Sequence, residues 1–300
     1  MVRRRLIPVV LLRDGVAVQS RGFRRWQVLG NPVTIVERLA AWSSDELIYL
    51  DIGRGGYDLG RDDLNAANRT DVLGILEDVA ARCFMPLTFG GRIRSVADAG
   101  ARLERGADKI AVTSGPLADP ALLTRLADEF GHQCVVVGID AVRGDDGDGW
   151  RAMAGGGRAP GREDAVAWAR EAVERGAGEI LLQSVDRDGR GGGYDLDLVA
   201  AVRDAVRVPV IALGGVGGWP HLLEGLAAGA DAVAAANIFN HSEHAVHKAK
   251  AFLQTAGAPV RPGALAADDA LDPALDLAVD SALDLARDPT VARALTEPCS

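Results

Sequence analysis

The chain has 300 residues, of which 48% are hydrophobic, and a net charge of −9. This length is enough for a large core in one or two α/β domains, and the acidic balance argues against a general affinity for nucleic acid. No apolar run approaches the roughly 18 residues that a membrane span needs.

The first apolar run follows Arg3 to Arg5 and imitates a secretory signal. It is short, contains Pro8 and leads directly into Arg13 and Asp14 without a small-residue cleavage site, so we interpret it as a buried strand. The three cysteines have neither metal-ligand spacing nor a disulfide framework. We therefore expect a cytoplasmic protein with no metal and no cofactor.

Short apolar runs alternate with helical patterns along the chain, which is typical of βα units around a parallel sheet. Eight runs are predicted as strands: Arg5–Leu12, Glu46–Ile52, Phe84–Phe89, Lys109–Thr113, Cys134–Asp140, Glu179–Val185, Val208–Leu213 and Ala232–Ala236. Helices are predicted near 33–42, 68–82, 96–105, 117–129, 163–175, 196–206, 219–228 and 242–255. This order predicts a single (β/α)8 TIM barrel over residues 1–258. A doubly wound sheet, the alternative, would use fewer strands.

Long connections are predicted at 13–31, 52–66, 141–162 and 186–195, all at the carboxyl ends of strands, where such barrels place their chemistry. Residues 144–157 are rich in glycine and predict a turn that leads into a small hairpin. Residues 259–300 change to Ala, Asp, Leu and Pro, and 261–300 hold eight acids against three bases. We expect an acidic appendage that is partly disordered or docks on a partner.

The chain contains an internal repeat. Pro86–Ser95 has a diverged echo in Pro209–Gly218, and the glycines Gly91 and Gly214 each precede the Asp of a Gly-Ala-Asp sequence by 17 residues. The repeat predicts two equivalent half-barrels and gives the barrel precedence over the doubly wound sheet.

Paired glycines at a strand end let the backbone approach an anion, and the following helix offers free N–H groups. One such pair is more often a tight turn. Two pairs in symmetric halves, with Thr113, Ser114 and Asn237 at the neighbouring strand ends, instead predict a ligand with two phosphates.

Carboxylates also gather at predicted strand ends, where an acid with a shifted pKa can transfer protons. They are Asp51, Asp140, Asp186 and Asp188, and for the last two a role in a turn or helix cap is equally expected. His241, His244 and His247 are predicted to form a solvated helix face rather than a metal site. No serine or cysteine lies in a nucleophile motif.

Four charged residues stand at the opposite ends of the predicted strands, and they are Arg5, Glu46, Lys109 and Glu179. In a barrel they converge on the bottom of the core and can pair as a ring. Four charges facing a narrow core are costly unless paired, so a special role is expected in addition to stability.

Over residues 3–260 the chain resembles HisF, the synthase subunit family of imidazole glycerol phosphate synthase. The resemblance rests on Asp45–Ile52, Pro86–Gly91 with Ile93–Ser95, Gly106–Lys109, Gln133–Asp140, Gly176–Leu182 and Ser184–Gly189 with Gly193 to Asp195. It implies two phosphate sites, and a heterodimer with a HisH-type glutaminase on the bottom of the barrel. Ammonia would pass through the core to a phosphorylated substrate at the top. The four-charge ring would then be the gate of the ammonia passage.

The resemblance also assigns roles to residues at the top. Asp140 matches the family's catalytic aspartate on strand 5, and Asp188 is a further catalytic candidate. The candidate phosphate-binding residues are Gly91, Arg92, Thr113, Ser114, Gly189, Gly214, Gly215 and Asn237.

The departures from the family pattern lie at the top. Leu11 replaces the strand-1 catalytic aspartate, Arg92 replaces the third glycine of the first loop, Thr113 replaces an asparagine and Leu213 a serine. A branch of HisF-like proteins in surface-sugar or other specialised pathways resembles this pattern and is thought to supply ammonia to a separate sugar amidotransferase. We therefore predict an ammonia-channelling paralogue. The alternatives are a lyase-type cyclase of histidine biosynthesis and a non-catalytic activator of the glutaminase.

Overall fold

A computed structural model describes residues 3–53, 71–145, 147–240 and 244–262, together with Val291 and Leu295. Its sheet contains eight parallel strands in the order β10-β11-β12-β1-β4-β5-β6-β7, and the β7–β10 pairing closes it. The strands are β1 (Arg5–Arg13), β4 (Leu47–Asp51), β5 (Leu87–Gly90), β6 (Lys109–Val112), β7 (Val135–Arg143), β10 (Glu179–Ser184), β11 (Val210–Leu213) and β12 (Ala232–Ala235). The predicted TIM barrel is confirmed.

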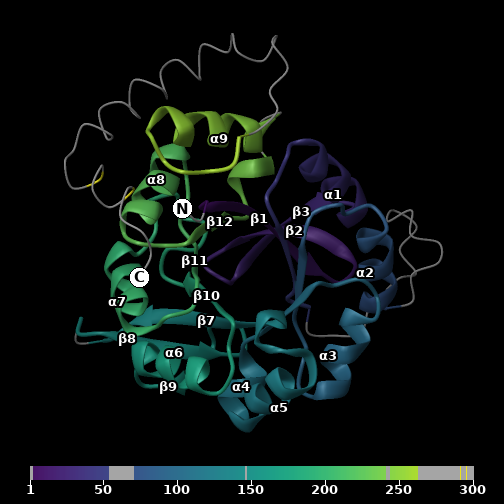
Figure 1. Cartoon of the computed structure of the whole chain (residues 1–300), viewed down its shortest axis with the longest axis vertical. Coiled ribbons are helices and arrows are strands. Elements are labelled where there is room, and N and C mark those ends of the chain that lie inside the picture. Colours follow the sequence, from purple (N-terminus) through teal and green to yellow (C-terminus); the bar gives the residue numbers. More distant parts are fainter. Residues whose placement is uncertain are drawn as a thin grey trace.

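Helices encircle these strands (Figure 1). They are α1 (Pro32–Ala41), α2 (Val72–Ala80), α3 (Val96–Leu103), α4 (Ser114–Ala118), α5 (Ala121–Phe130), α6 (Ala165–Glu174), α7 (Leu196–Ala205), α8 (Trp219–Ala227) and α9 (Ala245–Thr255). The fourth predicted helix is divided into α4 and α5. The division falls at Asp119, which is extended because Pro120 disfavours the helical conformation of the residue before it.

Two antiparallel hairpins extend the barrel at its carboxyl end. The pair β8 (Trp150–Ala154) and β9 (Ala159–Arg162) continues from β7, as the glycine-rich sequence predicts. The pair β2 (Val16–Arg21) and β3 (Arg25–Gly30) continues from β1 and was expected only as a connection. Its signal is Asp14-Gly15, both at positive φ between the paired residues Arg13 and Val16, which is a favoured two-residue hairpin turn.

The two halves of the barrel use equivalent hydrogen bonds. Asp108 Oδ2 accepts from the amide that opens β5, Leu87 N, at 2.8 Å, and Asp231 Oδ2 accepts from the amide that opens β11, Val210 N, at 2.9 Å. The repeated Gly-Ala-Asp sequences therefore anchor equivalent strands, and the half-barrel repeat is confirmed.

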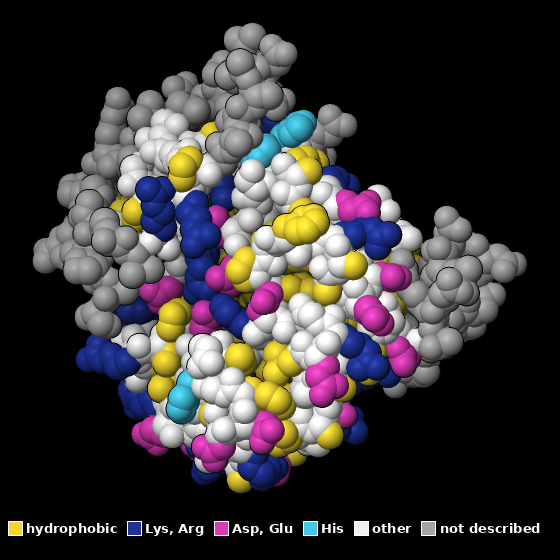
Figure 2. Space-filling view, turned by 45° about the vertical axis from the view of Figure 1, so that its right-hand side comes forward, with side chains coloured by type: hydrophobic (Ala, Val, Ile, Leu, Met, Phe, Trp, Pro, Cys, Tyr) yellow, Lys and Arg dark blue, Asp and Glu magenta, His cyan; other side chains and the backbone are white. Residues whose placement is uncertain are grey.

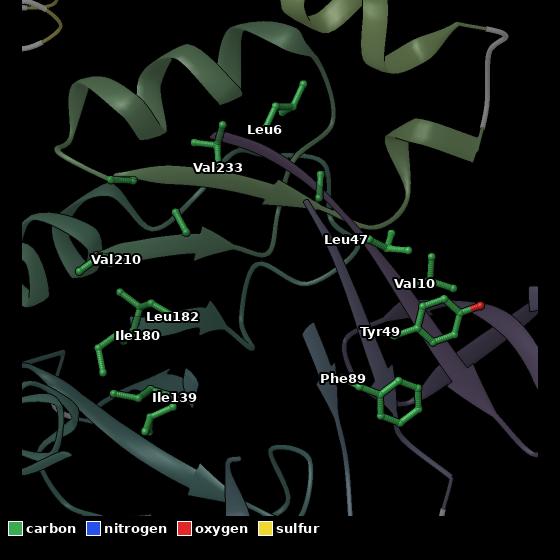
Figure 3. Close-up of a cluster of buried hydrophobic side chains, with 14 of the residues drawn as sticks. Leu6, Val10, Leu47, Tyr49, Phe89, Ile139, Ile180, Leu182, Val210 and Val233 are labelled. Carbon is green, nitrogen blue, oxygen red and sulfur yellow. The ribbon is translucent and has the colours of Figure 1, made fainter. Parts of the chain in front are cut away.

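The core has two parts on opposite faces of the strands. The larger part lies between strands and helices, and Figure 3 shows some of its strand residues, including Leu6, Tyr49 and Phe89. The smaller part lies in the barrel interior and contains Ile7, Val9, Leu11, Ile48, Ala111, Val136, Leu181, Ile211, Leu213, Ala232 and Ala234. Because both faces are buried, the strands appear in the sequence as continuous apolar runs.

The last helix packs on the amino end of the barrel more deeply than expected. His247 is only 6% exposed and its Nε2 lies 3.1 Å from Ser43 Oγ, so the predicted solvated histidine face is wrong for this residue. Lys250 is 1% exposed and its ammonium donates to Asp45 Oδ1 at 2.8 Å and to Ser43 O at 2.6 Å. The helix also buries Ala245, Val246, Ala249, Phe252 and Leu253, and the buried ammonium of Lys250 is tolerated because a carboxylate pairs with it.

The segment after α9 also contacts the barrel. Arg4 N donates to Pro259 O, and Arg4 forms a parallel bridge with Val260. Leu295 is 3% exposed within the larger core cluster, and Val291 packs against this cluster. The rest of the predicted appendage from residue 263, most of the predicted connection at 52–66, Cys299 and His241 lie outside the described residues. Within the described part, no helix is long and apolar enough to cross a membrane.

Candidate functional site

Asp188 lies at the carboxyl end of the barrel, in the loop after β10, and is 6% exposed. Its Oδ2 accepts hydrogen bonds from Ser20 Oγ at 2.7 Å and Phe23 N at 3.1 Å, both in the β2–β3 hairpin. Burial raises the pKa of Asp188, and these hydrogen bonds partly oppose the rise. The carboxylate therefore fixes the hairpin over the barrel mouth.

Asp140 lies on β7 opposite Gln183 of β10 and is partly exposed. Burial, and secondarily the negative charge of Asp188, raises its pKa to about 7. A carboxyl group with this pKa is part protonated and part ionised near neutral pH, so it can both donate and accept a proton. Asp140 is thus the residue at the barrel mouth best suited to acid–base chemistry.

Leu11 occupies the equivalent position of the first half-barrel. Leu12 O accepts from Ile52 N at 2.8 Å, and Ala141 O accepts from Val185 N at 2.9 Å, so Leu12 corresponds to Ala141 and Leu11 to Asp140. Leu11 is 7% exposed and belongs to the interior cluster. The mouth therefore has a carboxylate on the β7 side and an apolar side chain on the β1 side.

The first glycine loop follows β5. Gly91 has φ 105° and packs so closely on Asp51 O that a Cβ would overlap it, and Arg102 Nη2 donates to Gly91 O at 3.0 Å. Arg92 has φ 57°, and its Nε lies 3.0 Å from Asp51 Oδ2 and 3.1 Å from Gly53 O. The guanidinium of Arg92 is thus directed at a carboxylate.

Two neighbouring phosphate candidates also have protein partners. Thr113 Oγ1 fills the space that a Cβ on Gly138 would need. Ser114 Oγ accepts from Gly155 N at 3.0 Å, which ties the start of α4 to the β8–β9 hairpin.

The second glycine loop follows β11. Gly214 and Gly215 have φ 99° and 98°, and Gly215 O accepts from Gly193 N at 2.9 Å. Gly189 and Asn237 both lie against the backbone of Ser20. A Cβ added to Gly189 would lie 2.6 Å from Ser20 O, and Asn237 Nδ2 donates to the same oxygen at 3.1 Å. Ser20, which the sequence did not single out, therefore connects Asp188, Gly189 and Asn237. Ser20 is a polar residue within the alternating pattern of β2, and this is the sequence signal that could have identified it.

The other predicted carboxylates are used in structure. Asp51 is 5% exposed and contacts Arg92, while Asp186 Oδ2 accepts from Arg143 N at 2.8 Å. Among the described residues, no group of three or more His, Cys, Asp or Glu could hold a metal ion.

The four predicted charges at the opposite end form a closed ring. Arg5 Nη1 lies 2.8 Å from Glu46 Oε1 and 3.1 Å from Glu179 Oε1. Lys109 Nζ lies 3.3 Å from Glu46 Oε2 and 3.0 Å from Glu179 Oε1. Burial alone would lower the pKa of Arg5, but the carboxylates of Glu179 and Glu46 raise it. Each carboxylate thus joins both cations, and the ring covers the amino end of the apolar interior.

The surface near this end is hollowed between α1 and the start of β5. A hollow of about 520 Å³ is lined by Glu37, Ala40, Ala41, Ser44, Ala81, Arg82, Phe84 and Met85. Phe84 is 93% exposed, which is unusual for a large aromatic side chain.

Figure 2 shows one face of the molecule, on which acidic and basic side chains are interleaved and a vertical run of Lys and Arg lies left of centre. The net negative charge is therefore not spread evenly over this face.

A comparison with protein families agrees with this geometry. The family model described as "Histidine biosynthesis protein" matches residues 5–245, from the first barrel strand to the start of α9.

Proposed function

The chain belongs to the histidine biosynthesis protein family, whose members are TIM-barrel enzymes of the isomerase and cyclase type, and from this premise we propose that it is the synthase subunit of a glutamine amidotransferase. In this proposal a glutaminase of the HisH type releases ammonia at the amino end of the barrel. The ammonia passes through the barrel interior to a phosphorylated substrate at the carboxyl end. The acceptor belongs to a specialised pathway, such as surface-sugar synthesis, in which a separate amidotransferase takes part.

The ring of Arg5, Glu46, Lys109 and Glu179 carries this proposal. Its side chains are 11–18% exposed, so the cost of desolvating them is large and is offset only by their mutual contacts. Behind the ring, the interior cluster is apolar and includes Ala111, Ala232 and Ala234. An apolar interior suits neutral ammonia, and a polar ring at its entrance suits a molecule that arrives as ammonium and must lose a proton.

The hollow beside Phe84 supports a glutaminase partner. It lies near the same end of the barrel as the ring, and an aromatic side chain that is 93% exposed is typical of an interface anchor. A glutaminase that covers this surface would shield Phe84 from water and place its active site over the ring.

Asp140 supports chemistry at the other end. With a pKa raised to about 7 by burial and by Asp188, it can transfer a proton to or from a substrate held at the mouth. This observation also favours the second candidate, a true cyclase of histidine biosynthesis. Leu11 opposes that candidate, because the equivalent position in the first half cannot transfer a proton.

The gate is tested with the chain reconstituted with its glutaminase. Lys109→Met and Glu46→Gln should keep glutamine hydrolysis but lower the product formed per glutamine hydrolysed, because ammonia would escape before entering the barrel. Arg125→Met is the matched control, since it removes a surface ion pair with Asp119 and leaves the ring intact. Unchanged stoichiometry in both ring variants would refute the gate.

Two assays separate the remaining candidates. With free ammonium and the ribulose phosphate substrate of the histidine pathway, loss of a general acid should lower turnover by about 10²–10⁴ relative to an ordinary cyclase. A cyclase-like rate would establish the histidine-pathway alternative. If Asp140→Asn leaves amidation of the true acceptor unchanged, the barrel is a conduit or activator rather than a catalyst.

A further inference from the structure

The two glycine loops can be compared residue by residue because the half-barrels share their anchors. The Asp108 and Asp231 carboxylates bind the amides of Leu87 and Val210, which makes these strand openings equivalent. Five residues further along each chain, Arg92 corresponds to Gly215. Both have positive φ, 57° and 98°, so the arginine holds a backbone conformation that suits glycine.

The side chain of Arg92 explains why an arginine occupies this disfavoured conformation. Its Nε lies 3.0 Å from Oδ2 of Asp51, whose side chain is fully buried, and 3.1 Å from Gly53 O. Asp51 Oδ1 in turn accepts from Gly53 N at 2.9 Å. The cation and the buried carboxylate therefore compensate each other inside the first loop.

The first turn of the next helix is occupied as well. Ser95 Oγ accepts from Asp98 N at 3.1 Å, and Asp98 Oδ2 accepts from Arg94 N at 2.9 Å. These contacts hold the carboxylate of Asp98 beside the loop, where its negative charge opposes a bound anion.

The second loop uses the equivalent amide, because Gly217 N donates to His221 Nδ1 at 3.1 Å, but it has a histidine in the place of Asp98. Leu12 is equivalent to Ala141, and these residues pair with Asp51 and Ser184, so Asp51 corresponds to Ser184. Ser184 is 3% exposed, and its Oγ has no hydrogen-bond partner among the described residues. Arg187 Cβ lies 2.9 Å from the Cβ position of Gly215, and its guanidinium contacts Gly192 O at 3.3 Å. Gly218, which precedes α8, supplies no side-chain cap.

We propose that this chain has kept one anion subsite of the two: Gly214, Gly215, Ser184 and Arg187 bind a single phosphoryl group, and the Arg92–Asp51 pair has closed the equivalent site in the first half. The substrate is then a phosphomonoester whose other end is uncharged, rather than a bisphosphate. Arg92 is the residue that sets this specificity. The inference builds on the proposed function by narrowing its substrate class.

The location of phosphate binding is tested by NMR. Titration with inorganic phosphate should shift the amide resonances of Gly214 and Gly215 and leave that of Gly91 unchanged. Arg187→Ala should weaken these shifts. Shifts at Gly91 as well, or no shifts at either loop, would overturn the proposal.

The specificity is tested by calorimetry with an alkanediol monophosphate and the matching bisphosphate. The wild-type chain should bind both with similar affinity, whereas Arg92→Gly should bind the bisphosphate about tenfold more tightly. Arg92→Gly leaves the buried carboxylate of Asp51 without this cation. The double variant Asp51→Ser/Arg92→Gly removes both charges and copies Ser184 and Gly215 of the second loop, so it should also bind the bisphosphate more tightly than the wild-type chain does. Arg94→Gly removes an exposed arginine two residues away and should behave as the wild type.

A wild-type preference of tenfold or more for the bisphosphate would refute the closed first site, and so would a double variant that behaves as the wild type. Neither measurement uses glutaminase or turnover. Failure of the ammonia gate therefore leaves these results unaffected, and the two proposals can fail separately.

Discussion

The raised pKa of Asp140 makes the stability of the barrel depend on pH in a defined direction. In the unfolded chain this carboxyl ionises at its ordinary pKa of 3.8, whereas in the folded chain burial and Asp188 hold the pKa at about 7. Between these values the folded state retains a proton that the unfolded state releases. Asp140 therefore destabilises the fold progressively as pH rises from 4 to 7, and the full penalty is present above pH 7.

The size of the effect follows from the shift. A change from 3.8 to about 7 corresponds to about 4 kcal/mol at most. Asp140 keeps some contact with solvent, so this value is an upper limit. Asp140→Asn, which cannot ionise, should therefore raise the free energy of unfolding by up to about 4 kcal/mol at pH 8 and by less than half as much at pH 5.

Urea denaturation at pH 5, 6, 7 and 8 measures this difference for wild type and Asp140→Asn. Glu104→Gln, which changes an exposed acid at the end of α3, is the control and should follow the wild-type pH profile. If the Asp140→Asn and wild-type stabilities stay parallel from pH 5 to 8, the carboxyl group is not held protonated by the barrel. The acid–base role assigned to it would then lose its physical basis.

Two further substitutions test the packing that supports the site. Lys250→Met should lower the free energy of unfolding by about 3–5 kcal/mol, because it leaves Asp45 buried without its cation. Asp45 Oδ2 also accepts from Leu6 N at 2.8 Å, and a loss below about 1 kcal/mol in urea denaturation would show that this hydrogen bond alone satisfies Asp45. Gly91→Ala should destabilise more than Gly257→Ala by about 1–3 kcal/mol, since both glycines have positive φ but only a Cβ on Gly91 would overlap Asp51 O. Equal thermal shifts for the two variants would contradict the close contact between Gly91 and β4.

Much of the barrel could be predicted because the responsible signals are local. Each strand is an apolar run buried on both faces, and each half carries its own Gly-Ala-Asp anchor, so eight strands and their repeat are visible in the chain. The β2–β3 hairpin was missed because its residues were assigned to a loop, although Asp14-Gly15 is a hairpin signal. His247 was misplaced because the helical spacing of the histidines does not reveal which face Lys250 draws toward Asp45.

The sequence alone determined which chemical groups stand at each end of the barrel: four charges at the strand starts, and Asp140 with a leucine in the place of its symmetric partner at the strand ends. Only the tertiary structure decided what those groups contact. The ring closes because the first residues of β1, β6 and β10 and the residue just before β4 come within 3.3 Å of one another. Arg92 is directed at Asp51 because the loop after β5 packs on the end of β4. A side chain's charge is a property of its residue type, but whether it binds a ligand or a neighbour depends on partners that are far away in the chain.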